Sequence, residues 1–234
     1  MLSPIAWIVF VCMSLMLAIP FLVTLKFLSE GMRGTPILQM VYTSYWFWLV
    51  FPVALPLLTM RSFSEEYKSG TIEPLLTAPV TDWDVVLAKF CAITGVFTIS
   101  MLAPFFNLAF FQYVSQGKMP VEMSTLSLTA LILLLIGGLY VSVGIFASSL
   151  TRNQIIAAIL SFTFTTLLFF IGMLSFMIPD SVYNQALLYI FPYANVDVYA
   201  HGIFDTRELV FNLSGIFLFL ALTQSVMASR KLKG

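Results

Sequence analysis

Residues 125–150 read TLSLTALILLLIGGLYVSVGIFASSL, a run without a single charged side chain. A helix rises about 1.5 Å per residue, so about 20 residues cross the hydrocarbon core of a bilayer, and this run is long enough. Backbone groups inside lipid must be hydrogen-bonded within a helix or a closed barrel. Because the apolar residues are continuous and do not alternate with polar ones, the run predicts a membrane-spanning helix.

The composition of the whole chain agrees with this interpretation. Of its 234 residues, 60% are hydrophobic and 9% are charged, whereas a soluble domain carries about 25% charged residues. Because this small number of charges cannot cover a surface that faces water, lipid must cover much of the exterior. Six runs are long enough to span, at 5–25, 41–60, 85–114, 125–150, 155–178 and 209–228. We therefore expect an all-α, polytopic membrane protein with six transmembrane helices in one domain, 1–234.

The distribution of Lys and Arg predicts the orientation, because short cytoplasmic loops carry an excess of both. With a cytosolic N-terminus, the inner side holds Arg61, Lys68, Lys89, Arg152, Arg230, Lys231 and Lys233, and the outer side holds Lys26, Arg33, Lys118 and Arg207. We expect both termini in the cytosol. The first run has no basic region before it, so we expect a retained helix, not a cleaved signal peptide. Segment 179–208 is expected at the outer interface, since its apolar patch at 187–191 is too short to cross.

A charged stretch separates the second and third runs. Residues 61–90 read RSFSEEYKSGTIEPLLTAPVTDWDVVLAKF and hold five of the eleven acidic residues of the chain. Ser64 is predicted to cap a short helix, with Glu65 and Glu66 in its first turn, where the helix dipole favours anions. Gly70 suits the end of that helix.

A second short helix is predicted after Gly70, capped by Thr71 and ended by Pro79. Its residues are Ile72, Glu73, Pro74, Leu75 and Leu76. Ile72, Leu75 and Leu76 fall on one face of this helix. Thr81 and Asp84 then form a capping-box-like start for the third transmembrane helix. The short amphipathic helix could dock into a groove on a cytosolic partner, and a solvated loop on the lipid headgroups fits the physics equally well.

The small residues of the fourth run form pairs at the spacing that lets membrane helices approach closely. They are Gly137, Gly138, Ser142, Gly144 and Ser148. We predict that they pack helices together, either within the subunit or against a second copy. Packing without a functional role is the alternative, because such pairs are common in membrane helices.

Several functional classes are disfavoured. Gly117-Lys118 is followed by Met119 and has no upstream glycine at the spacing of a nucleotide-binding P-loop, so the chain cannot hold nucleotide by that route. No charged residue lies in the middle of a predicted span, which argues against an ion-driven carrier. His201, the only histidine, pairs only weakly with Asp205 as a metal ligand set, and no metal site is expected.

The stretch 61–90 resembles the coupling region of ABC-2 type transporter permeases. The matching positions are Gly70, Thr71, Ile72, Glu73, Leu75, Leu76, Pro79, Lys89 and Phe90. The resemblance extends to SPIA at 3–6, FASSLTRNQ at 146–154 and DTREL at 205–209, and it is nearest the gliding-motility-associated (GldF-like) branch. Two features depart from the family. Pro74 stands where members usually carry a leucine, and the sequence starts almost at the first span, without the usual basic amphipathic helix.

The resemblance implies a permease subunit of the bacterial inner membrane that is not itself an enzyme. ATP and Mg²⁺ would be held by a separate cytosolic ABC ATPase, which would dock on Glu65, Glu66 and residues 70–79. A second copy or a related permease would complete the membrane part, and a periplasmic accessory subunit would fit the gliding branch. Export is implied more strongly than import. The zero net charge carries no signature of nucleic-acid binding.

Two alternatives remain open. The first is an ATPase-coupled scaffold or force-transmitting subunit of a gliding or secretion complex, which would move no solute through its own interior. The second, more distant, is a membrane-embedded enzyme, for which no cluster of histidine, acid and nucleophile is present in the sequence. Solute flux in proteoliposomes separates a transporter from a scaffold.

Overall fold

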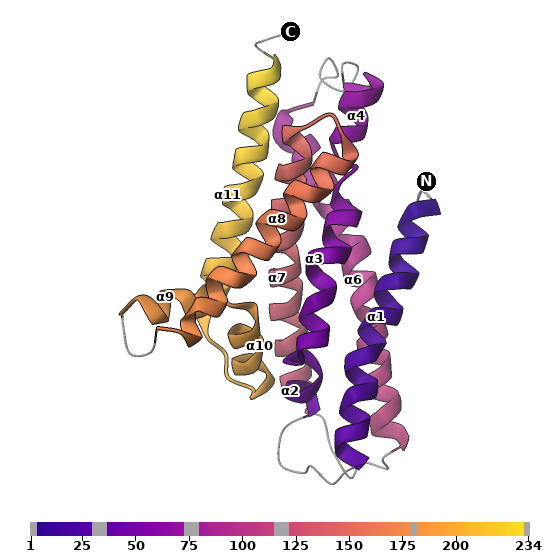
Figure 1. Ribbon diagram of the computed structural model, residues 1–234, viewed down its shortest axis with the longest axis vertical. Coiled ribbons are helices and arrows are strands. Elements are labelled where there is room, and N and C mark those ends of the chain that lie inside the picture. Colours follow the sequence, from indigo (N-terminus) through magenta and orange to yellow (C-terminus); the bar gives the residue numbers. More distant parts are fainter. Residues whose placement is uncertain (1–3, 30–36, 73–79, 115–121, 179–181, 232–234) are drawn as a thin grey trace.

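The computed structural model describes residues 4–29, 37–72, 80–114, 122–178 and 182–231. Within these ranges every regular element is a helix. The long helices run side by side in one bundle (Figure 1). Five helical stretches are long and apolar enough to cross a membrane, so the predicted all-α, polytopic membrane fold is confirmed.

The long helices are α1 (Pro4–Ser29), α3 (Tyr45–Thr59), α6 (Asp82–Val114), α7 (Met123–Leu150), α8 (Gln154–Met173) and α11 (Thr206–Lys231). The five candidate spans of the described part include every one of these except α1. The helix α1 has 26 residues, packs beside α3 and α6, and coincides with the first expected run. The helix α6 has 33 residues, which is about 50 Å of helix and more than the roughly 30 Å of a hydrocarbon core.

The second expected run, 41–60, is broken near its start. A short helix, α2 (Ile37–Tyr42), precedes α3, and Thr43 and Ser44 separate the two. The break has a local cause, because the Ser44 hydroxyl accepts a hydrogen bond from the Phe47 amide at 3.4 Å and caps the start of α3. An apolar pattern alone does not predict such a cap.

The helix α7 forms the centre of the bundle. Of its most apolar stretch 72% is buried, compared with 22% for α6 and 17% for α11. Its glycines permit this. A Cβ at Gly137 would lie 2.1 Å from the ring of Phe97 on α6, and one at Gly144 would lie 2.2 Å from Thr59 Oγ1 on α3. The small residues therefore face neighbouring helices of the same chain.

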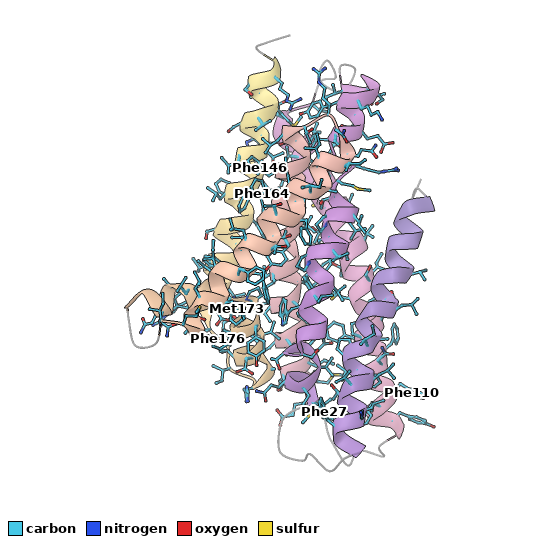
Figure 2. All side chains as sticks on the ribbon, viewed as in Figure 1. Phe27, Phe110, Phe146, Phe164, Met173 and Phe176 are labelled. Atoms are coloured by element: carbon cyan, nitrogen blue, oxygen red, sulfur yellow. The ribbon has the colours of Figure 1, made fainter. Side chains whose placement is uncertain are left out.

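The outer faces of the surrounding helices are apolar. Phe106 and Phe110 on α6, Ile155 on α8 and Phe217 on α11 are all well exposed, and Figure 2 shows Phe110 on the outside of the bundle. Exposed large apolar patches are rare on soluble proteins. These faces are suited to contact with lipid chains.

The two ends of the bundle differ in construction. At the upper end in Figure 1 lies a short helix, α4 (Ser64–Ser69), beside the C-terminal end of α11. At the lower end lie α2 and two further short helices, α9 (Val182–Ile190) and α10 (Pro192–Ala200). The segment expected at an interface, 179–208, is thus mostly helical, and Pro192 starts α10 where its missing N–H costs no bond.

Candidate functional site

The helix α4 follows α3 after a tight turn, and its first turn carries Glu65 and Glu66. It ends at Gly70, which adopts a left-handed conformation with φ of 74°. Residues with a side chain adopt that conformation only at a cost, so glycine is favoured here. The predicted end of this helix is therefore confirmed.

The predicted N-cap of α4 is wrong. Ser64 is the first residue of the helix, Phe63 holds the N-cap position, and the Ser64 hydroxyl donates to the Met60 carbonyl one turn earlier. The cap comes from Ser148 near the end of α7. Its Oγ accepts hydrogen bonds from the amides of Phe63 and Ser64, both at 3.1 Å, and donates to the Met60 carbonyl at 3.0 Å.

A single buried hydroxyl thus joins the end of α3, the start of α4 and the end of α7. The first amides of a helix have no partner within the helix, and a buried amide left unpaired costs about 1–3 kcal/mol. Ser148 was predicted only as a small packing residue. Sequence reasoning could not identify the cap, because the bonded residues are 84 and 85 positions apart.

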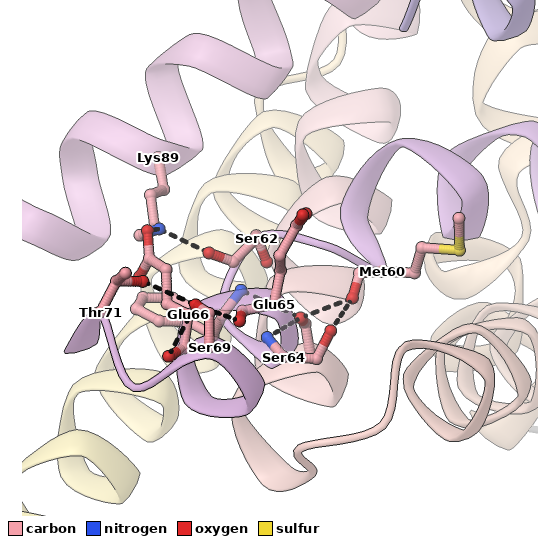
Figure 3. Close-up of polar contacts among 10 residues, drawn as sticks. Met60, Ser62, Ser64, Glu65, Glu66, Ser69, Thr71 and Lys89 are labelled. Atoms are coloured by element: carbon pink, nitrogen blue, oxygen red, sulfur yellow. Dashed lines mark hydrogen bonds and ion pairs between the residues drawn. The ribbon is translucent and has the colours of Figure 1, made fainter. Parts of the chain in front are cut away.

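Lys89 fastens α4 to α6. Its Nζ forms an ion pair with Glu66 Oε1 and donates to the Ser62 carbonyl, as Figure 3 shows. The same nitrogen lies 4.7 Å from the centre of the Phe63 ring. The side chains of Lys89 and Glu66 are only 19% and 29% exposed, so solvent screens this pair less than a surface pair.

Arg230 fastens α4 to α11. Its guanidinium lies 4.2 Å over the ring of Tyr67, and its Nη2 donates to the Leu150 carbonyl at 2.9 Å. The Tyr67 ring is itself stacked on Phe63, with 6.2 Å between ring centroids. We call Ser148, Lys89 and Arg230 the α4 clasp, because each comes from a different long helix and all three contact α4 or its first turn.

The other predicted coupling residues are partly described. Ile72 is buried, and Thr71 Oγ1 lies 2.8 Å from Ser69 Oγ, in a hydrogen bond. Glu65 lies 3.9 Å from Arg61 in a partly exposed ion pair. The remaining positions of the predicted amphipathic helix, Glu73, Pro74, Leu75, Leu76 and Pro79, lie outside the described residues.

The start of α6 follows the predicted capping box. The Thr81 amide donates to Asp84 Oδ2 at 2.9 Å, and the Asp84 amide donates back to Thr81 Oγ1 at 3.3 Å. This reciprocal pair satisfies two amides at the helix start. It fixes where the charged stretch re-enters the bundle, close to Lys89.

Some polar atoms near α4 have no hydrogen-bond partner among the residues that the structure describes. They are Arg61 Nε, Ser62 Oγ, Glu66 Oε2 and Tyr67 Oη. They lie between the end of α3 and the last turn of α4. The polar network around α4 is therefore incomplete within the described part of the chain.

The remaining small residues of α7 pack inside the bundle. Gly138 faces Ile216 on α11, and Ser142 is buried with its hydroxyl donating to the Leu139 carbonyl at 2.6 Å.

At the opposite end of the bundle, His201 Nδ1 lies 2.8 Å from the Asp197 carbonyl. Among the described residues no three His, Cys, Asp or Glu side chains gather as a metal site.

Comparison with known proteins identifies the family of this chain. No curated protein matches the sequence. A family model described as ABC-2 family transporter protein matches residues 3–172, which is most of the chain and includes α4 and the clasp residues Lys89 and Ser148. The chain therefore belongs to the ABC-2 family of transporter membrane proteins.

Proposed function

We propose that this chain is the membrane-spanning permease subunit of an ATP-driven exporter, and that its partner ABC ATPase docks at the α4 end. ATP and Mg²⁺ belong to the partner. The observation that carries the proposal is the α4 clasp, in which α6, α7 and α11 each bind one short, charged helix. Membership of the ABC-2 family supports a permease. The α4 clasp supports the transmission of movement from α4 to the long helices.

The contacts of the α4 clasp define how a movement of α4 would reach the long helices. A displacement of α4 acts on α7 through two hydrogen bonds to Ser148, and on α6 and α11 through two cations. Because α7 packs against most of the other helices, its movement must change their packing as well. Closure of two ATPases would thereby tilt the spans.

The proposal requires α4 on the cytosolic side. Basic residues support this, since Arg61, Lys68, Lys89, Arg152 and Arg230 all lie at or near the α4 end, and short cytoplasmic loops are enriched in such residues. Both termini are then cytosolic, and α9 and α10 face outward, toward the periplasm in a bacterial inner membrane.

Cysteine labelling tests this orientation. In a background with Cys12→Ser and Cys91→Ser, the variants are Ser69→Cys at the α4 end and Met123→Cys at the other end, both at exposed positions. A membrane-impermeant maleimide added to intact spheroplasts should label position 123 and spare position 69, and inverted vesicles should show the reverse. Labelling of position 69 in intact spheroplasts would refute a cytosolic docking site.

The docking surface is tested by charge reversal. Glu66 is a poor target because it is bound to Lys89, so its loss would also damage the clasp. Glu65→Lys combined with Leu75→Asp is cleaner, since the Glu65 side chain is 52% exposed. The matched control is Glu122→Lys, an exposed acid at the opposite end.

Co-purification of the co-expressed ATPase and its stimulated ATP hydrolysis are the measurements. The double variant should lose both, whereas Glu122→Lys should keep both. Unchanged complex and unchanged stimulation in the double variant would mean that the ATPase binds elsewhere. Solute flux in proteoliposomes then distinguishes an exporter from a force-transmitting scaffold.

The finer assignment rests on the sequence motifs. We propose that the chain belongs to the gliding-motility-associated (GldF-like) branch and pairs with a second copy or a related permease. The stretches at 146–154 and 205–209 support this branch. A neighbouring ATPase gene together with a gene for a large periplasmic accessory subunit would strengthen it.

A further inference from the structure

A cavity of about 490 Å³ lies at the end of the bundle opposite α4, between α9, α10 and the start of α11. Four aromatic side chains form much of its wall, namely Phe176, Tyr189, Phe191 and Tyr193, and Figure 2 shows Phe176 beside α9 and α10. The volume falls within the range of about 300–1,000 Å³ that small-molecule sites occupy. The cavity is therefore large enough for a ligand of modest size.

Glu208 lines this cavity and is only 5% exposed. Its Oε2 has no hydrogen-bond partner among the described residues. The nearby Asn212 amide group does not supply one, because its Nδ2 donates to the Glu208 backbone carbonyl at 2.8 Å. The Tyr199 hydroxyl donates to the Asp205 carbonyl instead. A buried carboxyl oxygen without a hydrogen-bond partner is costly, so it marks a place where a polar partner is missing.

The charged groups around the cavity are of both signs. Asp197, Arg207 and Glu208 are its charged lining residues. The Arg207 guanidinium donates through Nη1 to the Tyr189 hydroxyl at 3.2 Å, and Asp197 Oδ1 accepts from Gln39 Nε2 at 2.7 Å. The Arg207 side chain is thus bound to Tyr189, and within the described part of the chain it forms no ion pair with Glu208.

We propose that this cavity binds the ammonium group of an organic cation with an apolar body, with Glu208 as its counter-ion and the aromatic wall around it. A cation over an aromatic face is attracted by the ring quadrupole, and an ammonium next to Glu208 supplies the missing donor. Two sources share this chemistry, an amine-headed lipid and a soluble alkylammonium compound. The inference does not depend on ATPase docking, because the site is built only from residues at the opposite end.

Binding to the purified full-length chain tests the proposal with defined probes. Hexylammonium, which carries three N–H donors, is titrated by calorimetry, and its uncharged isostere 1-hexanol is the ligand control. In lipid nanodiscs, retention of phosphatidylethanolamine is compared with that of phosphatidylglycerol by native mass spectrometry. Preference for the cation in either experiment supports the site and identifies its source.

The variants assign the binding to this cavity. Glu208→Gln keeps the shape, and losing a charge-assisted contact should weaken cation binding by at least about tenfold. Tyr193→Leu removes one aromatic face and should weaken it by roughly threefold or more. Glu122→Gln, an exposed acid outside the cavity, should bind like the wild type.

Two results would overturn the proposal. One is equal binding of the cation and its uncharged isostere together with no preference for the amine-headed lipid. The other is unchanged cation affinity in both Glu208→Gln and Tyr193→Leu. Should Glu208→Gln fail to fold, Tyr193→Leu decides alone, because its side chain is only half-buried at the cavity wall.

Discussion

The two ends of the bundle use polar groups in opposite ways. At the α4 end, Ser148, Lys89 and Arg230 reach from three long helices to one short helix. At the other end, the helices α9 and α10 surround a cavity of about 490 Å³, and the buried Glu208 leaves an oxygen without a partner among the described residues.

The difference bears on the role that we propose for each end. Bonds between helices make the elements at the α4 end move together, which suits the transmission of force. A cavity with an unpaired buried carboxyl oxygen can instead accept a ligand, because a ligand that supplies the missing hydrogen-bond partner stabilises the complex relative to the empty protein. The following three substitutions test whether the ends differ in this way.

Ser148→Ala should have the largest effect. It leaves the amides of Phe63 and Ser64 without their acceptor, and each unpaired buried amide costs about 1–3 kcal/mol. The free energy of unfolding in detergent should fall by several kcal/mol, and stimulation of the partner ATPase should fall with it.

Ser149→Ala is the matched control for that substitution. Ser149 is equally buried, but its hydroxyl donates only to the Phe146 carbonyl of its own helix, at 2.7 Å. Its unfolding should stay close to that of the wild type. Equal stability losses in the two variants would show that the junction between helices has no special role.

Gly172→Ala should have an intermediate effect at the cavity end. A Cβ there would lie 2.6 Å from the Phe191 Cα, and backbone cannot rotate away as a side chain can. Overpacking of this kind costs about 1–3 kcal/mol, measured as a lower unfolding midpoint in detergent. Gly95→Ala is the control, because nothing lies within 4 Å of the added carbon. A stable Gly172→Ala variant would mean that α8 and the α9–α10 segment separate easily.

Arg230→Gln should have the smallest effect. It removes the cation over Tyr67, a contact worth about 0.5–1 kcal/mol at an exposed site. Stability should change little, while ATPase stimulation should drop, because α11 loses its contact with α4. Arg152→Gln, at an exposed arginine near the end of α7, should change neither quantity. Full stimulation in Arg230→Gln would remove α11 from the proposed route.

The sequence was informative wherever the interaction is local. Continuous apolar runs predicted the long helices, Gly70 marked the end of α4, and Thr81 with Asp84 marked the start of α6. Each helix boundary depends on residues within one or two helical turns, and each long helix depends on one continuous run of the sequence. The family resemblance likewise came from short motifs, and the match over residues 3–172 confirmed it at the level of the ABC-2 family.

Only the tertiary structure decided which residues meet across the bundle. The cap of α4 comes from α7, the ion pair of Glu66 comes from α6, and Glu208 reaches a cavity whose walls come from other helices. The sequence by itself determined that the chain is a bundle of apolar helices with one charged connection, because hydropathy acts along a continuous run. It could not determine the partners, because side chains far apart in the chain are brought together only when the helices pack.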